Sequence, residues 1–460
     1  MNRRKVLSQG ACAASALLFG PGKSHAESEM VALDRVKSFG LPDRALRGLI
    51  PDGSQDSLAV IAARWTKETG QNVELTIVPV DDINARMTID GLTDKLDFDF
   101  ALPATFGVSD LISAGVVQPF DSLRGALELN PQEDGSLYTI GDYVDGQRYG
   151  FQTDGDVYLM FYRADMMDDP ALGAAYTDLT GEPLIMPGNW ETLDTQMEFF
   201  HNPSMDRFGG ALFRIPGYLG WEFFARLYSA QGAILTDELE PLFDNDLAEH
   251  ALENMLRATD FLHPATASAG LFENWDLYKS NDIFANIGWG GSQKAFNRPG
   301  SPIRGKLKHA TLPGLSERGL SYFNWGWSYV IPATAMQPEL GYLFSRFAVS
   351  EQMSTISVRE IGGYFDPFQT SHYDDPEIIS AYSKPFLDVQ QSAMKLGSRN
   401  FVIPGHGAYM ASLNRNLSRA LDGSQTARQA LRIIVSEWDL TTLEFGRDEQ
   451  IKRWKDLAKD

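Results

Sequence analysis

The chain has 460 residues, more than a single hydrophobic core normally supports, so we expect at least two lobes. Hydrophobic residues make up 43% of it and charged residues 22%, the balance of an ordinary globular protein rather than a disordered or fibrous one. With 61 acidic against 40 basic residues the net charge is -21, and no basic run follows the first few positions. Because a protein that binds nucleic acid needs a basic face, the composition excludes nucleic acid as an expected partner.

The N-terminal segment has the parts of an export signal. Residues 3–5 are basic, and residues 11–19 form an apolar run that is too short to span a bilayer. Residues 24–26 then place small side chains at the two positions that a signal peptidase reads. We therefore predict a signal peptide over 1–26, a mature chain beginning at Glu27 and a periplasmic location, by ordinary secretion or by the twin-arginine route.

Cys12 is the only cysteine of the chain and lies within the predicted signal. The residues before it lack the apolar side chain that a lipoprotein signal carries three positions ahead of its cysteine, so we expect no lipid anchor. The mature chain would have no cysteine, and therefore no disulfide, thiol nucleophile or cysteine-ligated metal.

The mature chain alternates predicted strands and helices. A strand ends near Pro51, a turn follows in which Ser54 is a candidate N-cap, a helix ends before Gly70, and residues 73–77 alternate as a strand. This strand–helix–strand unit is typical of a parallel α/β sheet. The next expected elements are strands over 98–102, 157–162 and 283–289 and helices over 108–114, 248–262, 341–349, 413–421 and 427–440.

Several segments resemble a known family in their order and spacing. They are 59–70 (AVIAARWTKETG), 111–121 (LISAGVVQPFD), 149–151, 157–165 (VYLMFYRAD), 189–193 (NWETL), 221–235 (WEFFARLYSAQGAIL), 284–289 (FANIGW), 312–314 (LPG) and 343–352 (LFSRFAVSEQ). The chain resembles the extracellular solute-binding proteins of ABC importers, family 1, in the branch that contains maltose-binding protein. It differs in a longer connection over 169–189 and in the aromatic stretch 324–327.

The resemblance implies an α/β fold of the type II periplasmic binding protein kind, with two lobes and a ligand cleft and hinge between them. We assign 27–156 plus 313–366 to lobe 1 and 157–312 plus 367–460 to lobe 2. The implied function is capture of a small solute, a mono- or oligosaccharide in the first instance, and its delivery to the membrane permease of an ABC importer. We expect a monomer that uses no cofactor.

Candidate ligand-binding residues follow from the rule that such a cleft is lined by loops at strand ends. Asp52 and Ser54 open a helix, and they serve equally well as a simple cap. Asp154 and Asp156 lie two residues apart before an expected crossing strand, so both would point to one side and accept hydrogen bonds from ligand hydroxyls. A solvated turn is the alternative.

Aromatic residues next to glycine supply the rest of the predicted site. An indole face lies well against the C–H face of a sugar, and glycine lets the backbone come close. Trp325 and Trp327 would share one side of an extended chain, either in the cleft or in the core. The remaining candidates are Trp221, Trp289, Gly290, Tyr364 and His406.

Enzyme motifs are absent from the sequence. The 7 histidines lack metal-binding spacing, and there is no nucleophile elbow or phosphate loop, so we predict no catalytic residue and no metal site. A secreted glycoside hydrolase using Asp154 and Asp156 stays as an alternative, although its acid pair normally comes from different strands. A binding protein for a polyol or another solute that is not a sugar is the second alternative.

Overall fold

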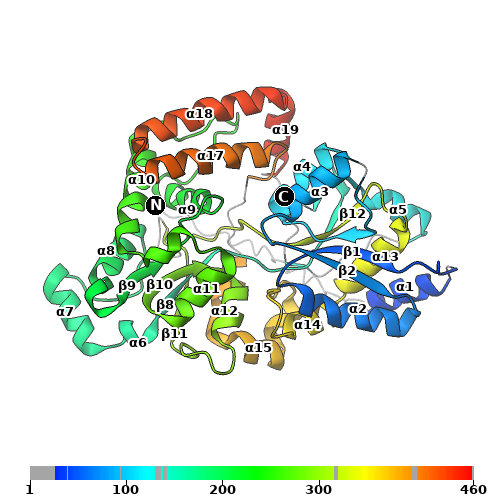
Figure 1. Cartoon of the computed structure of the whole chain (residues 1–460), viewed down its shortest axis with the longest axis horizontal. Helices are drawn as coiled ribbons and strands as arrows, with labels where there is room; N and C mark the ends of the chain where they lie inside the picture. Colours follow the sequence, from blue (N-terminus) through cyan, green and yellow to red (C-terminus); the bar gives the residue numbers. More distant parts are fainter. Residues whose placement is uncertain are drawn as a thin grey trace, which may run out of the picture.

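The computed structural model describes residues 26–38, 40–93, 95–129, 136–137, 142–314, 320–394 and 401–457. The predicted signal peptide lies outside this range except for Ala26. Two sheets covered by helices form two lobes that face each other across the molecule (Figure 1). Within the described residues, no helix is both long and apolar enough to cross a bilayer.

Lobe 1 is built on a sheet with the strand order β2-β1-β3-β12-β4, with β7 also pairing with β12. Its strands are β1 (Leu46–Pro51), β2 (Val73–Val78), β3 (Phe100–Ala101), β4 (Val117–Gln118), β7 (Gly150–Gln152) and β12 (Ser328–Pro332), and β5 (Tyr143–Val144) and β6 (Gln147–Arg148) form a separate hairpin. Its helices are α1 (Ala26–Lys37), α2 (Gln55–Thr69), α3 (Ile83–Leu92), α4 (Val108–Ser113), α5 (Phe120–Ala126), α13 (Pro338–Ala348) and α14 (Glu351–Arg359), with the 3-10 turn η1 (Thr105–Gly107).

Lobe 2 is built on a sheet with the strand order β11-β8-β10-β9. The strands are β8 (Leu159–Arg163), β9 (Arg207–Ala211), β10 (Asp282–Gly288) and β11 (Leu307–Thr311). The helices are α6 (Ala164–Met167), α7 (Pro170–Thr180), α8 (Trp190–Phe200), α9 (Leu219–Gln231), α10 (Asp246–Ala258), α11 (Leu271–Ser280), α12 (Gly290–Phe296), α15 (Pro376–Tyr382), α16 (Lys384–Met394), α17 (His406–Leu421), α18 (Ala427–Glu444) and α19 (Arg447–Leu457). The 3-10 turns are η2 (Pro203–Met205), η3 (Thr259–Phe261), η4 (Pro264–Ala267) and η5 (Thr370–Asp374).

Helix α2 shows how the local sequence sets the fold. Leu58, Ile61 and Trp65 recur at helical spacing, and all three are fully buried against the lobe 1 core. The helix ends at Gly70, as predicted. Ser54 occupies the N-cap position, as predicted, but its hydroxyl donates to the carbonyl of Pro51 at 2.6 Å and accepts from no backbone N–H of the helix.

The strands of the first unit are parallel, as the sequence predicts, but both sheets are mixed. β1 pairs in parallel with β2 and β3, whereas β12 runs antiparallel to β3, β4 and β7. In lobe 2, β8 runs antiparallel to β10 and β11. In each of these two sheets one strand runs opposite to the others, β12 in lobe 1 and β8 in lobe 2, and each follows a passage of the chain from the other lobe.

Within the described residues, three stretches of chain connect the lobes: 153–158 between β7 and β8, 312–314 with 320–327 between β11 and β12, and 360–375 between α14 and α15. We call them the first, second and third crossings. Beyond the third crossing, α17 packs against α9 and α18 against α10, which places the C-terminal helices on lobe 2 (Figure 1).

Candidate ligand-binding site

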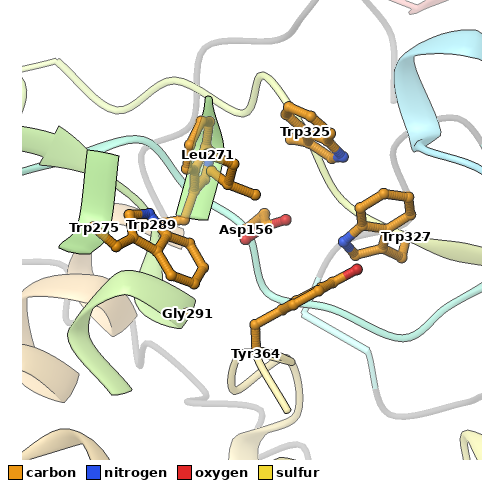
Figure 2. A pocket seen from close by; sticks show the side chains of 8 residues that line it. All are labelled: Asp156, Leu271, Trp275, Trp289, Gly291, Trp325, Trp327 and Tyr364. Carbon is orange, nitrogen blue, oxygen red and sulfur yellow. The ribbon is translucent and has the colours of Figure 1, made fainter. Parts of the chain in front are cut away.

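A pocket lies where the crossings meet, within a hollow of about 280 Å³ that includes space open to solvent. Asp156 from the first crossing, Trp325 and Trp327 from the second and Tyr364 from the third all contribute to its wall. Figure 2 shows these side chains grouped around Asp156. The complete lining is Asp156, Leu271, Trp275, Trp289, Gly291, Trp325, Trp327 and Tyr364. The three passages between the lobes therefore meet at one aromatic pocket.

Trp325 and Trp327 line the cavity from one short segment. Their ring centroids are 5.7 Å apart, and Gly326 between them has a φ of 146°, a conformation that a residue with a Cβ rarely adopts. The carbonyl of Gly326 accepts from the Thr105 N–H at 2.9 Å, and the carbonyl of Trp327 accepts from the Thr153 N–H at 2.9 Å. Backbone bonds to lobe 1 thus hold this segment in place.

The opposite wall belongs to lobe 2. Trp289 stacks on Tyr158 with ring centroids 4.8 Å apart, and its indole N–H donates to Asn324 Oδ1 at 2.9 Å. Trp275 and Leu271, four residues apart on α11, face the cavity from the same side of that helix. Sequence reasoning missed both, together with Gly291, because Leu271 and Trp275 follow the spacing of an ordinary helix core.

A cluster of acidic side chains lies beside the pocket. One carboxylate oxygen from each of Asp154, Asp156 and Asp366 can be chosen so that all lie within 4.8 Å of one another, and all three residues are buried. The Asp366 N–H donates to Asp154 Oδ1 at 2.5 Å, which joins the first crossing to the third. Gly290 approaches the cluster closely, since a Cβ at this position would fall 2.5 Å from the Asp366 carboxyl.

Burial and mutual repulsion raise the pKa values of this cluster. Burial raises the pKa of Asp154 and of Asp156 well above the ordinary value, and neighbouring carboxylates raise both further. Burial likewise raises the pKa of Asp366 to about 7. Lys294 is 1% exposed, and burial lowers the pKa of its ammonium to about 8. The pocket therefore stands next to a set of strongly perturbed carboxyl groups, a combination that marks functional sites.

The model of the bacterial extracellular solute-binding protein family matches residues 51–354 of the chain. The chain belongs to this family. Its members are extracellular, which agrees with the export signal that the sequence predicts. The predicted type II two-lobe fold and the resemblance to this family are both confirmed.

Solved structures agree with this fold. An ABC transporter solute-binding protein from Agrobacterium radiobacter K84 in complex with ribitol has a TM-score of 0.75 at 16% identity, covering 87% of this chain and 99% of its own. Maltose-bound MalE3 of T. maritima has a TM-score of 0.73 at 16% identity, covering 86% of this chain and 100% of its own. A solute-binding protein from Thermotoga lettingae TMO bound to alpha-D-tagatose has a TM-score of 0.74 at 17% identity, covering 87% and 100%. A search of curated protein sequences gives no match.

Several predicted site residues of this solute-binding protein lie around the pocket without lining it. Trp221 is 4% exposed and packs behind Trp325, with ring centroids 5.0 Å apart. His406 is buried and stacks on Phe106 with centroids 5.5 Å apart, and burial lowers its pKa to about 4. Asp154 and Gly290 belong to the acidic cluster behind the wall.

The turn of Asp52 and Ser54 also stays outside the pocket lining. Asp52 is exposed and accepts from the Gly53 N–H at 2.8 Å, so it stabilises its own turn. Gly53 touches the facing parts of the molecule, since a Cβ there would fall 2.6 Å from Phe272 of α11 and 2.7 Å from Tyr364. This turn of lobe 1 therefore closes against lobe 2 beside the pocket.

Further contacts join the lobes directly. Asp110 on α4 of lobe 1 accepts from the backbone N–H groups of Gly405 at 2.6 Å and Gly407 at 2.9 Å, at the start of α17 of lobe 2. The hydroxyl of Tyr218, which precedes α9, donates to Asp81 Oδ1 at 2.8 Å across the same boundary. The structure is thus a closed form of the solute-binding protein, held by polar contacts on both sides of the pocket.

Proposed function

We propose that this protein captures a small sugar or polyol in the periplasm and delivers it to the permease of an ABC importer. The observation that supports this best is the aromatic pocket with a lining carboxylate at the meeting point of the crossings. A ligand bound there touches both lobes and all three crossings, so its binding energy can favour the closed form over an open one.

The size of the cavity favours a small ligand. In this form of the protein the walls leave little free space between them, so a small ligand requires less opening of the lobes than a long one. Among the related structures, ribitol, D-mannitol and alpha-D-tagatose are small ligands of this kind, whereas others hold maltose or maltotetraose. We therefore place a monosaccharide or an alditol ahead of an oligosaccharide as the ligand.

The chemistry of the wall suits hydroxylated carbon chains. The indole faces offer apolar surface to C–H groups. The indole N–H groups of Trp275 and Trp325 are buried and have no hydrogen-bond partner in the protein, so each can donate to a ligand oxygen. The carboxyl group of Asp156 can accept from a ligand hydroxyl.

The acidic cluster does not favour glycoside hydrolysis, because Asp154, Asp156 and Asp366 are buried together beside the pocket. Hydrolases place their two carboxyl groups on opposite sides of the scissile bond, about 5–5.5 Å apart in retaining and about 6.5–9.5 Å apart in inverting enzymes. Here carboxylate oxygens of Asp154, Asp156 and Asp366 gather within 4.8 Å on one side of the pocket. This grouping supports binding without catalysis.

The remaining parts of the proposal concern the whole protein. We infer export with removal of residues 1–26, no lipid on Cys12, and action as a monomer. We also keep the lobe boundaries at 156, 312 and 366, each of which falls within a crossing. An intact mass of the natural mature protein tests the first part, since a retained N-terminus or an acyl group would contradict it.

A thermal-shift screen over sugars, alditols, amino acids and polyamines tests the proposed function. A ligand that binds only the folded protein raises its melting temperature. We expect stabilisation by one or more small sugars or alditols, with about one bound per chain by calorimetry and the recovered ligand unchanged. Hydrolysis of the ligand that is lost in Asp156→Asn would instead favour the glycosidase. Stabilisation by none of the sugars and alditols would refute the proposal.

A further inference from the structure

The pocket combines aromatic faces with a carboxylate in the way that suits a positive charge. The rings of Trp289 and Trp325 have centroids 5.6 Å apart and planes 80° apart, and those of Trp327 and Tyr364 are 6.0 Å apart and 40° apart. A ligand in this pocket meets aromatic faces from several directions, with Asp156 among them (Figure 2). Amine and ammonium ligands are recognised by such cages, because the ring faces attract a cation.

Charge near the pocket favours a cation as well. Asp156 is the acidic side chain of the described lining, and carboxylate oxygens of Asp154 and Asp366 lie within 4.8 Å of its own. An ammonium group bound beside these carboxyls lowers their pKa and favours their ionised form. Among the described residues that line the cavity there is no Lys or Arg. The buried ammonium of Lys294 donates to the carbonyls of Glu360 at 3.0 Å and Phe365 at 3.1 Å.

The buried indole N–H groups of the pocket also constrain the chemistry of the ligand. Trp275 is 7% exposed and Trp325 is 5% exposed, and neither indole nitrogen has a hydrogen-bond partner in the protein. A buried donor without a partner costs free energy, so a ligand gains by bringing an oxygen atom to each. A ligand that pairs with all these groups of the pocket wall therefore carries hydroxyl oxygens in addition to a positively charged group.

We propose that the pocket takes a small polyhydroxylated amine, an amino sugar or an amino alditol. Its ammonium group lies against the indole faces beside Asp156, and its oxygens accept from the indole N–H groups of Trp275 and Trp325. This assignment rests on the proposed function, since it names the class of solute that the same pocket captures.

Calorimetry on the mature protein with matched ligand pairs tests the assignment. The pairs are D-glucose and D-glucosamine, D-galactose and D-galactosamine, D-mannose and D-mannosamine, and D-sorbitol and D-glucamine, each differing in one hydroxyl that is replaced by an amine. We expect the amine of the best pair to bind about tenfold more tightly than its neutral partner, a difference of about 1.4 kcal/mol.

Two variants assign that preference to the pocket. Asp156→Asn keeps the shape and removes the carboxyl group that can ionise beside an ammonium, so the amine and the neutral partner should then bind within about threefold of each other. Asp276→Asn is the matched control, because it removes an acid next to Trp275 whose side chain is 73% exposed and pairs with Lys279. The control should keep the full preference. Melting temperatures show that both variants are folded, and the comparison of ligand pairs on the unmodified protein needs no variant.

The outcomes separate this inference from the proposed function. Neutral sugars or alditols that bind as tightly as their amines overturn the inference and leave the proposed function standing. Binding of no sugar, alditol or amine overturns both. Stabilisation of the ligand-free protein by Ca²⁺ or Mg²⁺ alone would assign the carboxylates to a metal and also overturn the inference. A tenfold preference that survives Asp156→Asn would refute the role of that carboxylate.

Discussion

This protein contains two buried groups of ionisable side chains that differ in how their charges are arranged. In lobe 2, Arg226 donates to Asp194 with two bonds of 2.8 Å and to Glu222 at 2.9 Å, and Arg214 donates to Glu222 at 2.6 Å. The charges alternate in sign, and all four side chains are 1–2% exposed. Burial alone would raise the pKa of Glu222, but the two guanidinium groups outweigh it and lower the pKa.

The acidic cluster at the pocket gathers charges of one sign instead. Burial and the neighbouring carboxyls raise the pKa of each of Asp154, Asp156 and Asp366. This grouping does not stabilise the fold, because buried like charges cost free energy. From this comparison we infer that the lobe 2 network stabilises the fold, whereas the acidic cluster serves the ligand that we propose for the pocket.

Arg226→Met gives the largest expected effect. The substitution removes the bonds to Asp194 and Glu222 and leaves Asp194 buried without its cation. Breaking a buried ion pair from one side costs about 3–5 kcal/mol of unfolding free energy. Urea denaturation measures the change. The control is Lys384→Met, which removes an exposed ion pair to Asp388 on α16 and should change stability by less than about 1 kcal/mol. Equal effects of the two substitutions would contradict the structural role of the network.

The raised pKa of Asp366 at the pocket should make the stability of the protein depend on pH. The folded protein holds a proton on Asp366 up to about pH 7, above the ordinary carboxyl pKa of 3.8, because burial raises that pKa. The folded state therefore binds more protons than the unfolded chain between these values. The contribution of this group is complete below about pH 4 and is lost as the pH rises through about 7.

Glu222, whose pKa is lowered, acts in the other direction and loses its contribution as the pH falls below its ordinary value of 4.5. Buried histidines such as His406, whose pKa burial lowers to about 4, gain stability as the pH rises, so the contribution of Asp366 is measured against Asp366→Asn. Relative to that variant, the ligand-free protein should lose on the order of 2–4 kcal/mol of unfolding free energy between pH 5 and pH 8. Melting temperatures of the two proteins against pH measure this, and a difference that stays constant with pH would show that Asp366 is ionised in the folded protein.

Trp325→Ala and Trp438→Ala separate the pocket from the core. Trp438 is 1% exposed and packs on Phe401 with ring centroids 5.2 Å apart, so its loss should cost about 3–5 kcal/mol of stability. Trp325 borders the cavity, and its loss should weaken ligand binding by about 1–3 kcal/mol with a smaller loss of stability. Melting temperature without ligand and dissociation constant with ligand are measured on each variant. If Trp325→Ala melted as low as Trp438→Ala and still bound normally, the ring would be packing and not recognition.

The part of the fold that follows local periodicity could be predicted from the sequence. The period of α2 and the alternation of β2 depend on neighbouring residues alone, so both elements lie where they were expected. The short helix α1 was not predicted, because its pattern is weak and its stability comes from packing on α13 and α14, which are distant in sequence.

Local spacing also explains which part of the site could be predicted from the sequence. Trp325 and Trp327 share a side because they are two residues apart on an extended segment, and both line the cavity. Asp366 contacts Asp154 although the two residues are 212 positions apart, so no local sequence pattern could predict the contact. Trp275 was missed because its helical spacing is typical of a core residue. Only the three-dimensional arrangement of the crossings places that face of α11 at the pocket.

Asp110→Asn should have the smallest effect, and it tests whether the lobes move apart. The Asp110 carboxylate caps the start of α17 from the other lobe, and burial raises its pKa while the backbone N–H groups of Gly407 and Gly405 lower it. The amide of Asn keeps one acceptor oxygen and loses the charge that faces the positive end of the helix. Loss of such a cap costs about 1 kcal/mol.

The measurement that shows the change depends on when the contact forms. If α4 and α17 separate in the open form, Asp110→Asn weakens ligand binding about fivefold and leaves the melting temperature of the free protein unchanged. Asp90→Asn serves as the control, because Asp90 pairs with Arg86 within α3 of lobe 1 and should leave the dissociation constant unaltered. A lower melting temperature of the free Asp110→Asn protein with unchanged affinity would mean that the contact persists in the open form. The start of α17 would then move with lobe 1, and the hinge would have to lie beyond it in the chain.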